Sequence, residues 1–372
     1  MSAEGPISLD QLVSPVSEGN PTGIDIRKNN SPDTRYYAIK EARNAARAAE
    51  RSNLFDSDSS EADIQWQKVL ELAPEIIQNQ TKDLEITCWY TEALVRRYGF
   101  QGLRDGFELI KSLMEQYWDD LYPLPDEDGI ETRVACLTGL NGEGAEGVLI
   151  APIRNVNLTG SSDPGPFSYW NYQQALEVDK TIEQEAKTAK ASKLGFSIAD
   201  IERAVTESSD SFYADLHDDL QDSLSLYREI GALLDRYCGI NDSPPTSNII
   251  NILEDCLGAV KHLGKHKIPS TETDDQESDN DSEESAASGS DSSEVTRSTG
   301  SIRDRADAFK KIMDISEFFR KTEPHSPIPY ILERAVKWGD MPLEDLIKEL
   351  IPDSSARDLY GSLTGIRTDE DY

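Results

Sequence analysis

The chain has 372 residues, of which 37% are hydrophobic, and a formal net charge of −33 at pH 7. That length suggests two or three domains. The strong negative charge argues against non-specific binding to nucleic acid or to anionic membranes, because both kinds of partner recruit lysine and arginine.

The sequence shows no sign of export or membrane insertion. The first residues, MSAEGPISLDQLVSP, lack the apolar core of a secretory signal. The longest apolar run, Val148 to Ile153, contains Pro152 and is too short to span a bilayer. The four cysteines form no CxxC pair and lie in apolar helical patterns. We therefore expect reduced, buried thiols and a cytoplasmic protein.

Apolar residues recur at helical spacing along most of the first 265 positions. One stripe runs from Leu84 to Tyr98 and ends at Gly99, where a left-handed helix cap fits. Another runs from Leu103 to Leu121, and further helical patterns cover residues 172–194 and 212–237. Paired alternating runs joined by Asn-Gly or Asp-Gly turns do not occur. The sequence therefore predicts an all-α fold.

Residues 269–296 interrupt this pattern with ten acidic residues, eight serines and no lysine or arginine. Such a segment cannot bury enough apolar surface to fold. We interpret it as a solvated spacer, with an acidic partner-binding segment as the alternative. The predicted organisation is an N-terminal helical domain over 1–175, a helical middle region over 176–265, an acidic disordered linker over 266–300 and a small C-terminal helical oligomerisation domain over 301–372.

The segment after the linker predicts three short helices, with breaks at Pro324 and Asp340. This piece has too few residues to enclose its apolar side chains in one monomeric core. We therefore expect those side chains to be buried against other copies of the chain, with an ordinary three-helix core as the alternative for Trp338. The predicted oligomer interface comprises Phe309, Phe319, Tyr330, Leu332, Arg334, Trp338 and Leu346.

The acidic stretch YWDDLYPLPDEDG, residues 117–129, invites comparison with a calcium loop. Alignment of Asp126, Asp128 and Gly129 on the EF-hand pattern places Leu124 and Ala135 at positions that need oxygen ligands. No histidine lies in this half of the chain to support a general acid–base pair. Turn chemistry at prolines and at Asp128–Gly129 accounts for the stretch.

The other candidate chemical motifs are incomplete. Gly142, Gly144 and Gly147 form G-x-G-x-x-G, but no strand precedes them, and Glu143 and Glu146 would repel a phosphate, so we expect a flexible loop. The four histidines are scattered and complete no zinc set. Nucleophile-elbow, P-loop and kinase signatures do not occur. We therefore predict a non-enzymatic protein with no catalytic residue, cofactor or metal.

Several segments form an ordered set of motifs: PVSEGNPTGIDIR (15–27), YWDDLYPLPDEDGIETRVACLTGLN (117–141), and LIAPIRNVNLTG followed by FSYWNYQQA. Over roughly residues 12–175 this set resembles the ImpA N-terminal domain of TssA proteins of the bacterial type VI secretion system. FFRKTEPHSPIPYILERAVKWGDMPLEDLIKELI is similar to the C-terminal segment of short TssA forms. The matched N-terminal residues are Pro21, Gly23, Asp25, Trp118, Asp119, Leu121, Tyr122, Pro123, Asp126, Asp128, Gly129, Arg133, Ala151, Pro152 and Ile153.

The resemblance implies a cytoplasmic structural protein, in which a C-terminal ring carries outward N-terminal arms and helps baseplate and tail tube/sheath assembly. The implied partners are other copies of the chain and the baseplate, tube and sheath proteins. Contact with the membrane complex stays open, without membrane insertion, and no nucleic acid is expected. The motif residues would fix a helix–turn–helix junction, with Arg133 available to pair with a carboxylate. The alternative is an acidic helical adaptor or hydrolase unrelated to secretion, with a pocket near Trp118.

Overall fold

In the computed structural model of the chain, the described residues form thirteen α-helices and isolated bridges but no strand. The predicted all-α fold is therefore confirmed. The chain divides into two compact units, Met1–Asp279 and Asn280–Tyr372. The described residues are 5–29, 31, 34–52, 60–127, 129–161, 163–239, 242–268, 305–322, 327–339, 341, 346 and 349.

Three predictions fall wholly or mostly outside the described residues. They are the acidic linker beyond residue 268, the turn residue Asp128 and the third C-terminal helix, of which only single positions are described. The predicted domain boundary at residue 175 stays a prediction. The first unit nevertheless packs helices from both sides of that boundary against one another.

The described residues of the first unit form eleven α-helices, and short connections join most of them. They are α1 (Leu9–Val13), α2 (Arg35–Ser52), α3 (Ser60–Asn79), α4 (Leu84–Tyr117), α5 (Glu131–Asn141), α6 (Ile150–Asn155), α7 (Tyr169–Asp179), α8 (Gln184–Leu194), α9 (Ile198–Glu207), α10 (Asp210–Cys238) and α11 (Ser247–Leu263).

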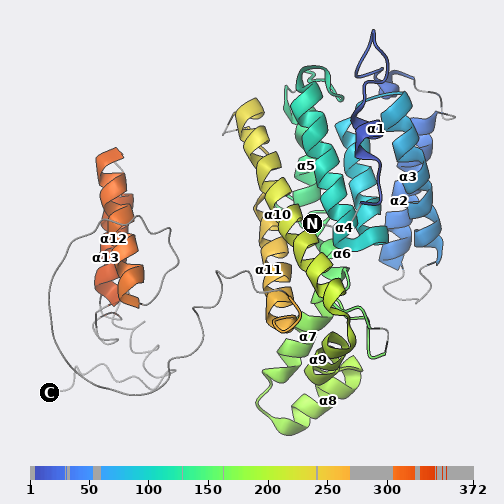
Figure 1. Cartoon of the computed structure of the whole chain (residues 1–372). Coiled ribbons are helices and arrows are strands. Elements are labelled where there is room, and N and C mark those ends of the chain that lie inside the picture. Colours follow the sequence, from blue (N-terminus) through green and yellow to red (C-terminus); the bar gives the residue numbers. More distant parts are fainter. Residues whose placement is uncertain are drawn as a thin grey trace, which may run out of the picture. The chain divides into compact units, whose positions relative to one another are not determined.

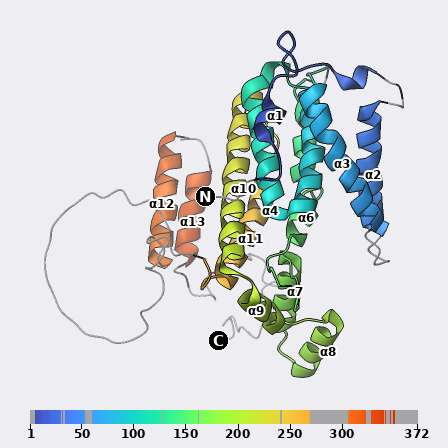
Figure 2. The same cartoon turned by 45° about the vertical axis from the view of Figure 1, so that its right-hand side comes forward.

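Helix α4 is the centre of the first unit. Figure 1 shows α2 and α3 on one side of it and α10 and α11 on the other, and α3 and α10 both pack directly on α4. Every residue from Ile86 to Val95 is buried, so this part of the helix has no solvent face. A helix that is buried all round lies in the core of a layered bundle. Helices α7, α8 and α9 gather at one end of the unit (Figures 1 and 2).

Gly99 breaks α4, as the sequence predicted, but the chain resumes its helix from Phe100. The Gly99 φ angle of +61° lies in the region that favours glycine. An added Cβ would also lie 3.0 Å from Cγ1 of Val156, the residue that follows α6. The kink therefore lets the second half of α4 change direction while α6 stays close to it.

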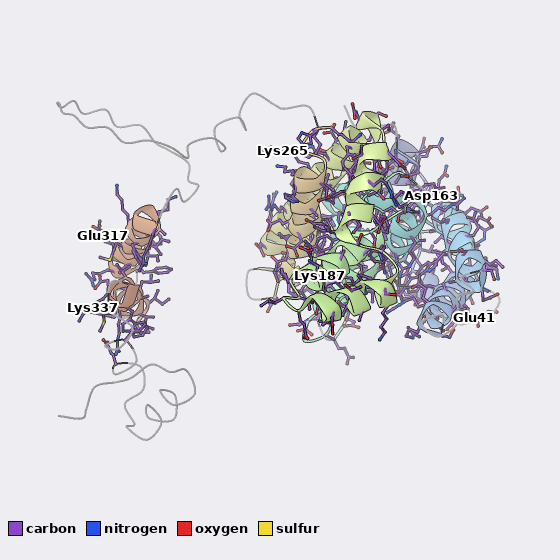
Figure 3. All side chains as sticks on the ribbon, turned by 90° about the horizontal axis from the view of Figure 1, so that it is seen from below. Glu41, Asp163, Lys187, Lys265, Glu317 and Lys337 are labelled. Carbon is purple, nitrogen blue, oxygen red and sulfur yellow. The ribbon has the colours of Figure 1, made fainter. Side chains whose placement is uncertain are left out.

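The second unit contains α12 (Arg305–Thr322) and α13 (Ile328–Gly339), which pack against each other. Both helices lie where the sequence predicted them. The buried Ser316 hydroxyl donates to the Pro329 carbonyl at 3.0 Å, and an added Cβ at Gly339 would clash with the Phe309 ring. Figure 3 shows charged side chains such as Glu317 and Lys337 projecting from this pair.

A buried charge cluster joins α4 to α10. The Arg104 guanidinium donates to Asp105 Oδ1 at 2.8 Å and also to Asp219 of α10. All three side chains are almost entirely shielded from water. Burial raises the pKa of Asp219 to about 6, in spite of the neighbouring Arg104. Removal of the arginine would leave two carboxylates without their shared cation.

We therefore expect Arg104→Met to lower the free energy of unfolding by roughly 3–5 kcal/mol, the usual cost of breaking a buried ion pair. Urea unfolding followed by tryptophan fluorescence measures this loss. The matched control is Arg228→Met, because Arg228 pairs with Glu254 on the surface, with both side chains about half exposed. That change should cost less than about 1 kcal/mol. Equal losses in the two variants would contradict the role of Arg104.

Candidate functional site

Two of the family-like motifs, residues 15–27 and 117–141, meet at the start of α4. The Lys82 amide donates to the Thr22 carbonyl at 2.8 Å, and the Tyr122 amide donates to the Lys82 carbonyl at 3.0 Å. Gly23 has a φ of +73°, and an added Cβ there would lie 2.0 Å from the Gln80 carbonyl oxygen. Only glycine therefore permits this close approach of two backbone segments.

An ion-pair cluster fixes the same junction. Arg27 donates to both oxygens of Asp83, at 2.6 and 3.0 Å, and to Glu85 at 2.7 Å. Asp83 is fully buried and also accepts from the Ile86 amide, so it caps α4. The predicted motif residue Asp25 accepts from the Arg27 amide at 3.1 Å and so positions that arginine. Sequence reasoning did not single out Arg27 or Asp83, although an aspartate directly before an apolar helix was an available signal.

Arg133 holds the turn that follows α4. Its guanidinium donates to the carbonyls of Trp118 at 2.6 Å, Pro123 at 3.0 Å and Asp119 at 3.4 Å. The sequence led us to expect a carboxylate as the partner of Arg133. The structure shows main-chain carbonyl oxygens instead, because the bend in the chain turns them toward this buried side chain. The guanidinium also lies 5.1 Å from the centre of the Trp118 ring, which stacks on Tyr237 at 4.6 Å.

The remaining motif residues lie around these two clusters or apart from them. Tyr122 and Pro123 connect the clusters, since Tyr122 pairs with the start of α4 and Pro123 accepts from Arg133. Gly129 turns the chain with a φ of +78°, and Pro21 is exposed at the edge. Pro152 lies elsewhere, in α6. Most of the motif residues therefore build one junction of backbone segments.

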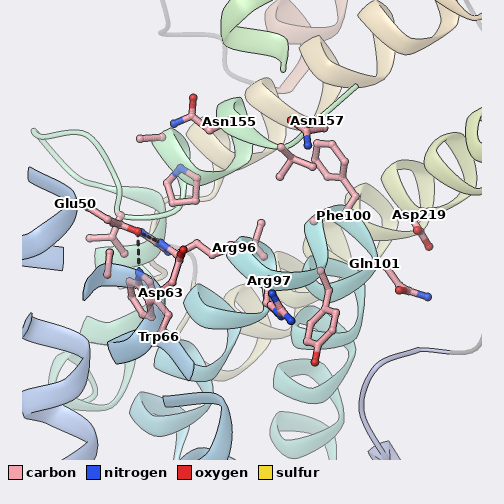
Figure 4. Close-up of a pocket in the computed structure, with 18 of the residues that line it drawn as sticks. Glu50, Asp63, Trp66, Arg96, Arg97, Phe100, Gln101, Asn155, Asn157 and Asp219 are labelled. Carbon is pink, nitrogen blue, oxygen red and sulfur yellow. Dashed lines mark hydrogen bonds and ion pairs between the residues drawn. The ribbon is translucent and has the colours of Figure 1, made fainter. Parts of the chain in front are cut away.

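A pocket of about 1270 Å³ lies between α2, α3, α4, α6 and α10 (Figure 4). Pro152 lines it, together with Asn155 and Asn157 of the third motif. Trp118 does not line it, contrary to the pocket that the adaptor or hydrolase alternative placed there. Within the part of the chain that the structure describes, no group of three or more His, Cys, Asp or Glu residues is placed to hold a metal ion.

One wall of this pocket is held by a charged and aromatic cluster. Glu50 Oε1 accepts from Trp66 Nε1 at 2.7 Å and from Arg96 Nε at 2.6 Å. The Arg96 guanidinium lies 4.1 Å from the centre of the Trp66 ring. These residues come from α2, α3 and α4, so no sequence pattern brings them together. Among the described residues of both units, no helix is long and apolar enough to cross a membrane.

We expect Arg133→Lys to destabilise the first unit by roughly 2–3 kcal/mol, because lysine keeps the charge but cannot reproduce the planar fork on three carbonyls. Urea unfolding measures the change. Arg35→Lys is the matched control, since Arg35 forms an exposed ion pair with Glu75. An Arg133→Lys protein as stable as this control would show that charge alone accounts for the contribution of Arg133.

Comparison with known proteins identifies relatives of both units. The family profile described as "ImpA, N-terminal, type VI secretion system" matches residues 13–142. Over 352 residues the chain is 24% identical to the type VI secretion system component TssA1 of Pseudomonas aeruginosa, which covers 93% of this chain and 96% of that relative.

A solved structure is similar to a large part of the chain. It is the N-terminal domain, including the conserved ImpA_N region, of the TssA component of the type VI secretion system from Burkholderia cenocepacia. The TM-score is 0.57 at 26% identity, over 71% of this chain and 96% of that one. The family profile, the relative and the solved structure all indicate the same family as the sequence motifs that meet at the start of α4. Together these findings support the assignment of the chain to the TssA family of the type VI secretion system.

Proposed function

We propose that this protein is a structural component that helps baseplate and tail tube/sheath assembly in the cytoplasm. In this proposal the second unit joins copies of the chain into a ring, and the first units extend outward to baseplate, tube and sheath proteins. The similarity to TssA1 along 93% of the chain supports this assignment, because it includes both units. The role is structural rather than enzymatic.

The observation that carries the ring proposal is the apolar surface of α12 and α13. These helices have 18 and 12 residues, yet they expose six large apolar side chains to solvent. The whole described part of the first unit exposes the same number. A concentration of this kind marks an interaction surface on a small helical piece. The six residues are Met313, Ile315, Phe318, Ile328, Tyr330 and Ile331.

We propose that the interface between copies combines these exposed residues with the predicted ones. Tyr330 and Arg334 are exposed on α13, in keeping with a contact role. The other predicted residues are half-buried within the second unit, so they would pack beneath the exposed residues and hold them in place. They are Phe309, Phe319, Leu332, Trp338 and Leu346.

For the motif residues of the first unit we propose a scaffolding role. Gly23, Asp25 and Arg133 each act on the backbone or on a buried charge, as described above. Tyr122 and Pro123 connect the two clusters, because Tyr122 bonds to the backbone at the start of α4 and Pro123 accepts from Arg133. A fixed junction of this kind would present the outer loops of the first unit to partners in one conformation.

Ile331→Asp tests the interface, because it places a charge on a side chain that is 59% exposed in one copy. We expect light scattering to give a mass many times that of one chain for the natural protein and a much lower mass for the variant. Circular dichroism should show unchanged helix content.

The control is Lys321→Ala, which removes an exposed ion pair with Glu317 on α12 and should leave the mass unchanged. A natural protein that is monomeric at all concentrations would contradict the ring and favour the adaptor alternative. A variant that keeps the full mass would remove Ile331 from the interface.

A further inference from the structure

The pocket between α2, α3, α4, α6 and α10 is a groove lined by side chains of different chemistry. From α2 and α4 the lining includes the exposed residues Arg51, Arg97 and Tyr98. From α10 it includes the exposed Asp215 and the half-buried Phe212. A volume of about 1270 Å³ exceeds the few hundred to about 1000 Å³ typical of small-molecule sites. The groove therefore suits an elongated ligand.

Two arginines of the lining carry positive charge that no described residue neutralises. Arg51 and Arg97 form no ion pair with any other described residue. Burial lowers the pKa of Arg47, and the neighbouring Arg51 and Arg96 act in the same direction. Five carboxylates line the pocket, and three of them already have cationic partners: Glu50 with Arg96, Glu146 with Arg154 and Asp219 with Arg104. In a chain with a net charge of −33, the two arginines without an ion pair would attract an acidic group.

The wall opposite Arg97 offers amide groups. Figure 4 shows Asn155 and Asn157 on one side of the pocket and Arg97 on the other. Both asparagines are exposed, and neither side chain forms a hydrogen bond within the described part of the protein. A carboxamide has one acceptor oxygen and two donor hydrogens, which match the N–H and C=O groups of a peptide backbone. Tyr98 and Phe212 add aromatic surface for apolar side chains.

We propose that this groove binds an extended peptide segment of a partner protein, with acidic side chains at Arg51 or Arg97 and backbone groups on Asn155 and Asn157. A free anion would use only the arginines and leave the amides and aromatic rings without a partner. Nucleic acid is disfavoured because Asp63 and Asp215 also line the groove. The inference deepens the proposed function, since it rests on the first unit's contact with assembly partners and names the chemistry of that contact.

Selection of random short peptides displayed on phage against the full-length protein tests the proposal. We expect enriched sequences with at least one acidic residue near an apolar one, and no enrichment of basic sequences. A synthetic, fluorescein-labelled copy of the most enriched peptide then reports affinity by fluorescence anisotropy. Its affinity should fall as salt increases, because an exposed charge contact is screened.

Two double variants of the full chain locate the bound peptide. Arg51→Ala with Arg97→Ala should weaken binding about tenfold or more, as expected for the loss of charge-assisted hydrogen bonds. Asn155→Ala with Asn157→Ala should weaken it about fivefold without changing its salt dependence. The matched control is Arg203→Ala, which removes an exposed arginine of α9 whose ion-pair partner is Asp200 and which does not line the groove.

The proposal is overturned if no peptide sequence is enriched, or if enriched peptides bind both double variants as tightly as the natural protein. Enriched sequences without acidic residues would equally overturn it. All four substituted positions are exposed, so circular dichroism should confirm unchanged folding. These results are independent of the ring test, because mass in solution depends on the second unit and peptide binding on the first. A failure of the peptide-binding proposal would therefore leave the ring proposal standing, and the reverse also holds.

Discussion

Helix α4 is so deeply buried that each charged residue on its inner turns needs a partner from another part of the chain. An unpaired charge in such surroundings would cost several kcal/mol, so these pairs select which neighbouring element packs at each level of the helix. The pairs therefore fix the order of the bundle more specifically than apolar contact alone. They are Asp83 with Arg27, Glu92 with Arg43, Arg96 with Glu50 and Arg104 with Asp219.

The same constraint explains how the charges of this acidic protein are distributed. The chain has 70 acidic residues and only 37 lysines and arginines, and several of those arginines are committed to pairs around α4. The unpaired acidic groups are left mainly on the outer faces, where water solvates them. Glu41 and Asp163 are exposed examples, and both are labelled in Figure 3. Arg51 and Arg97 form no ion pair with any other described residue, and both line the same groove.

The two units solve the problem of burying apolar surface in different ways. The first encloses its apolar residues around α4, and large residues such as Phe107 and Tyr227 are fully buried between α4 and α10. In the second unit, α12 and α13 are too short to cover one another's apolar faces. Ile315 and Ile331 therefore remain about half exposed. The first unit has the features of a self-sufficient fold, whereas the second has those of a piece completed by association.

The sequence by itself determined the helical class and several local features. Helical spacing of apolar residues predicted the two halves of α4, and glycine's freedom at positive φ predicted the break at Gly99. The order of the motifs indicated the family that the comparisons support. These features depend on local backbone preferences or on residues close together in the chain, so a single sequence carries them.

Only the tertiary structure decided which distant residues meet. Arg133 was predicted to find a carboxylate, but the path of the chain after α4 brought three carbonyl oxygens to it instead. Arg27 and Asp83 are more than fifty positions apart, and the groove draws residues from five helices. Such contacts depend on how helices pack against one another. The apolar pattern specifies that a helix face is buried, but not which partner buries it.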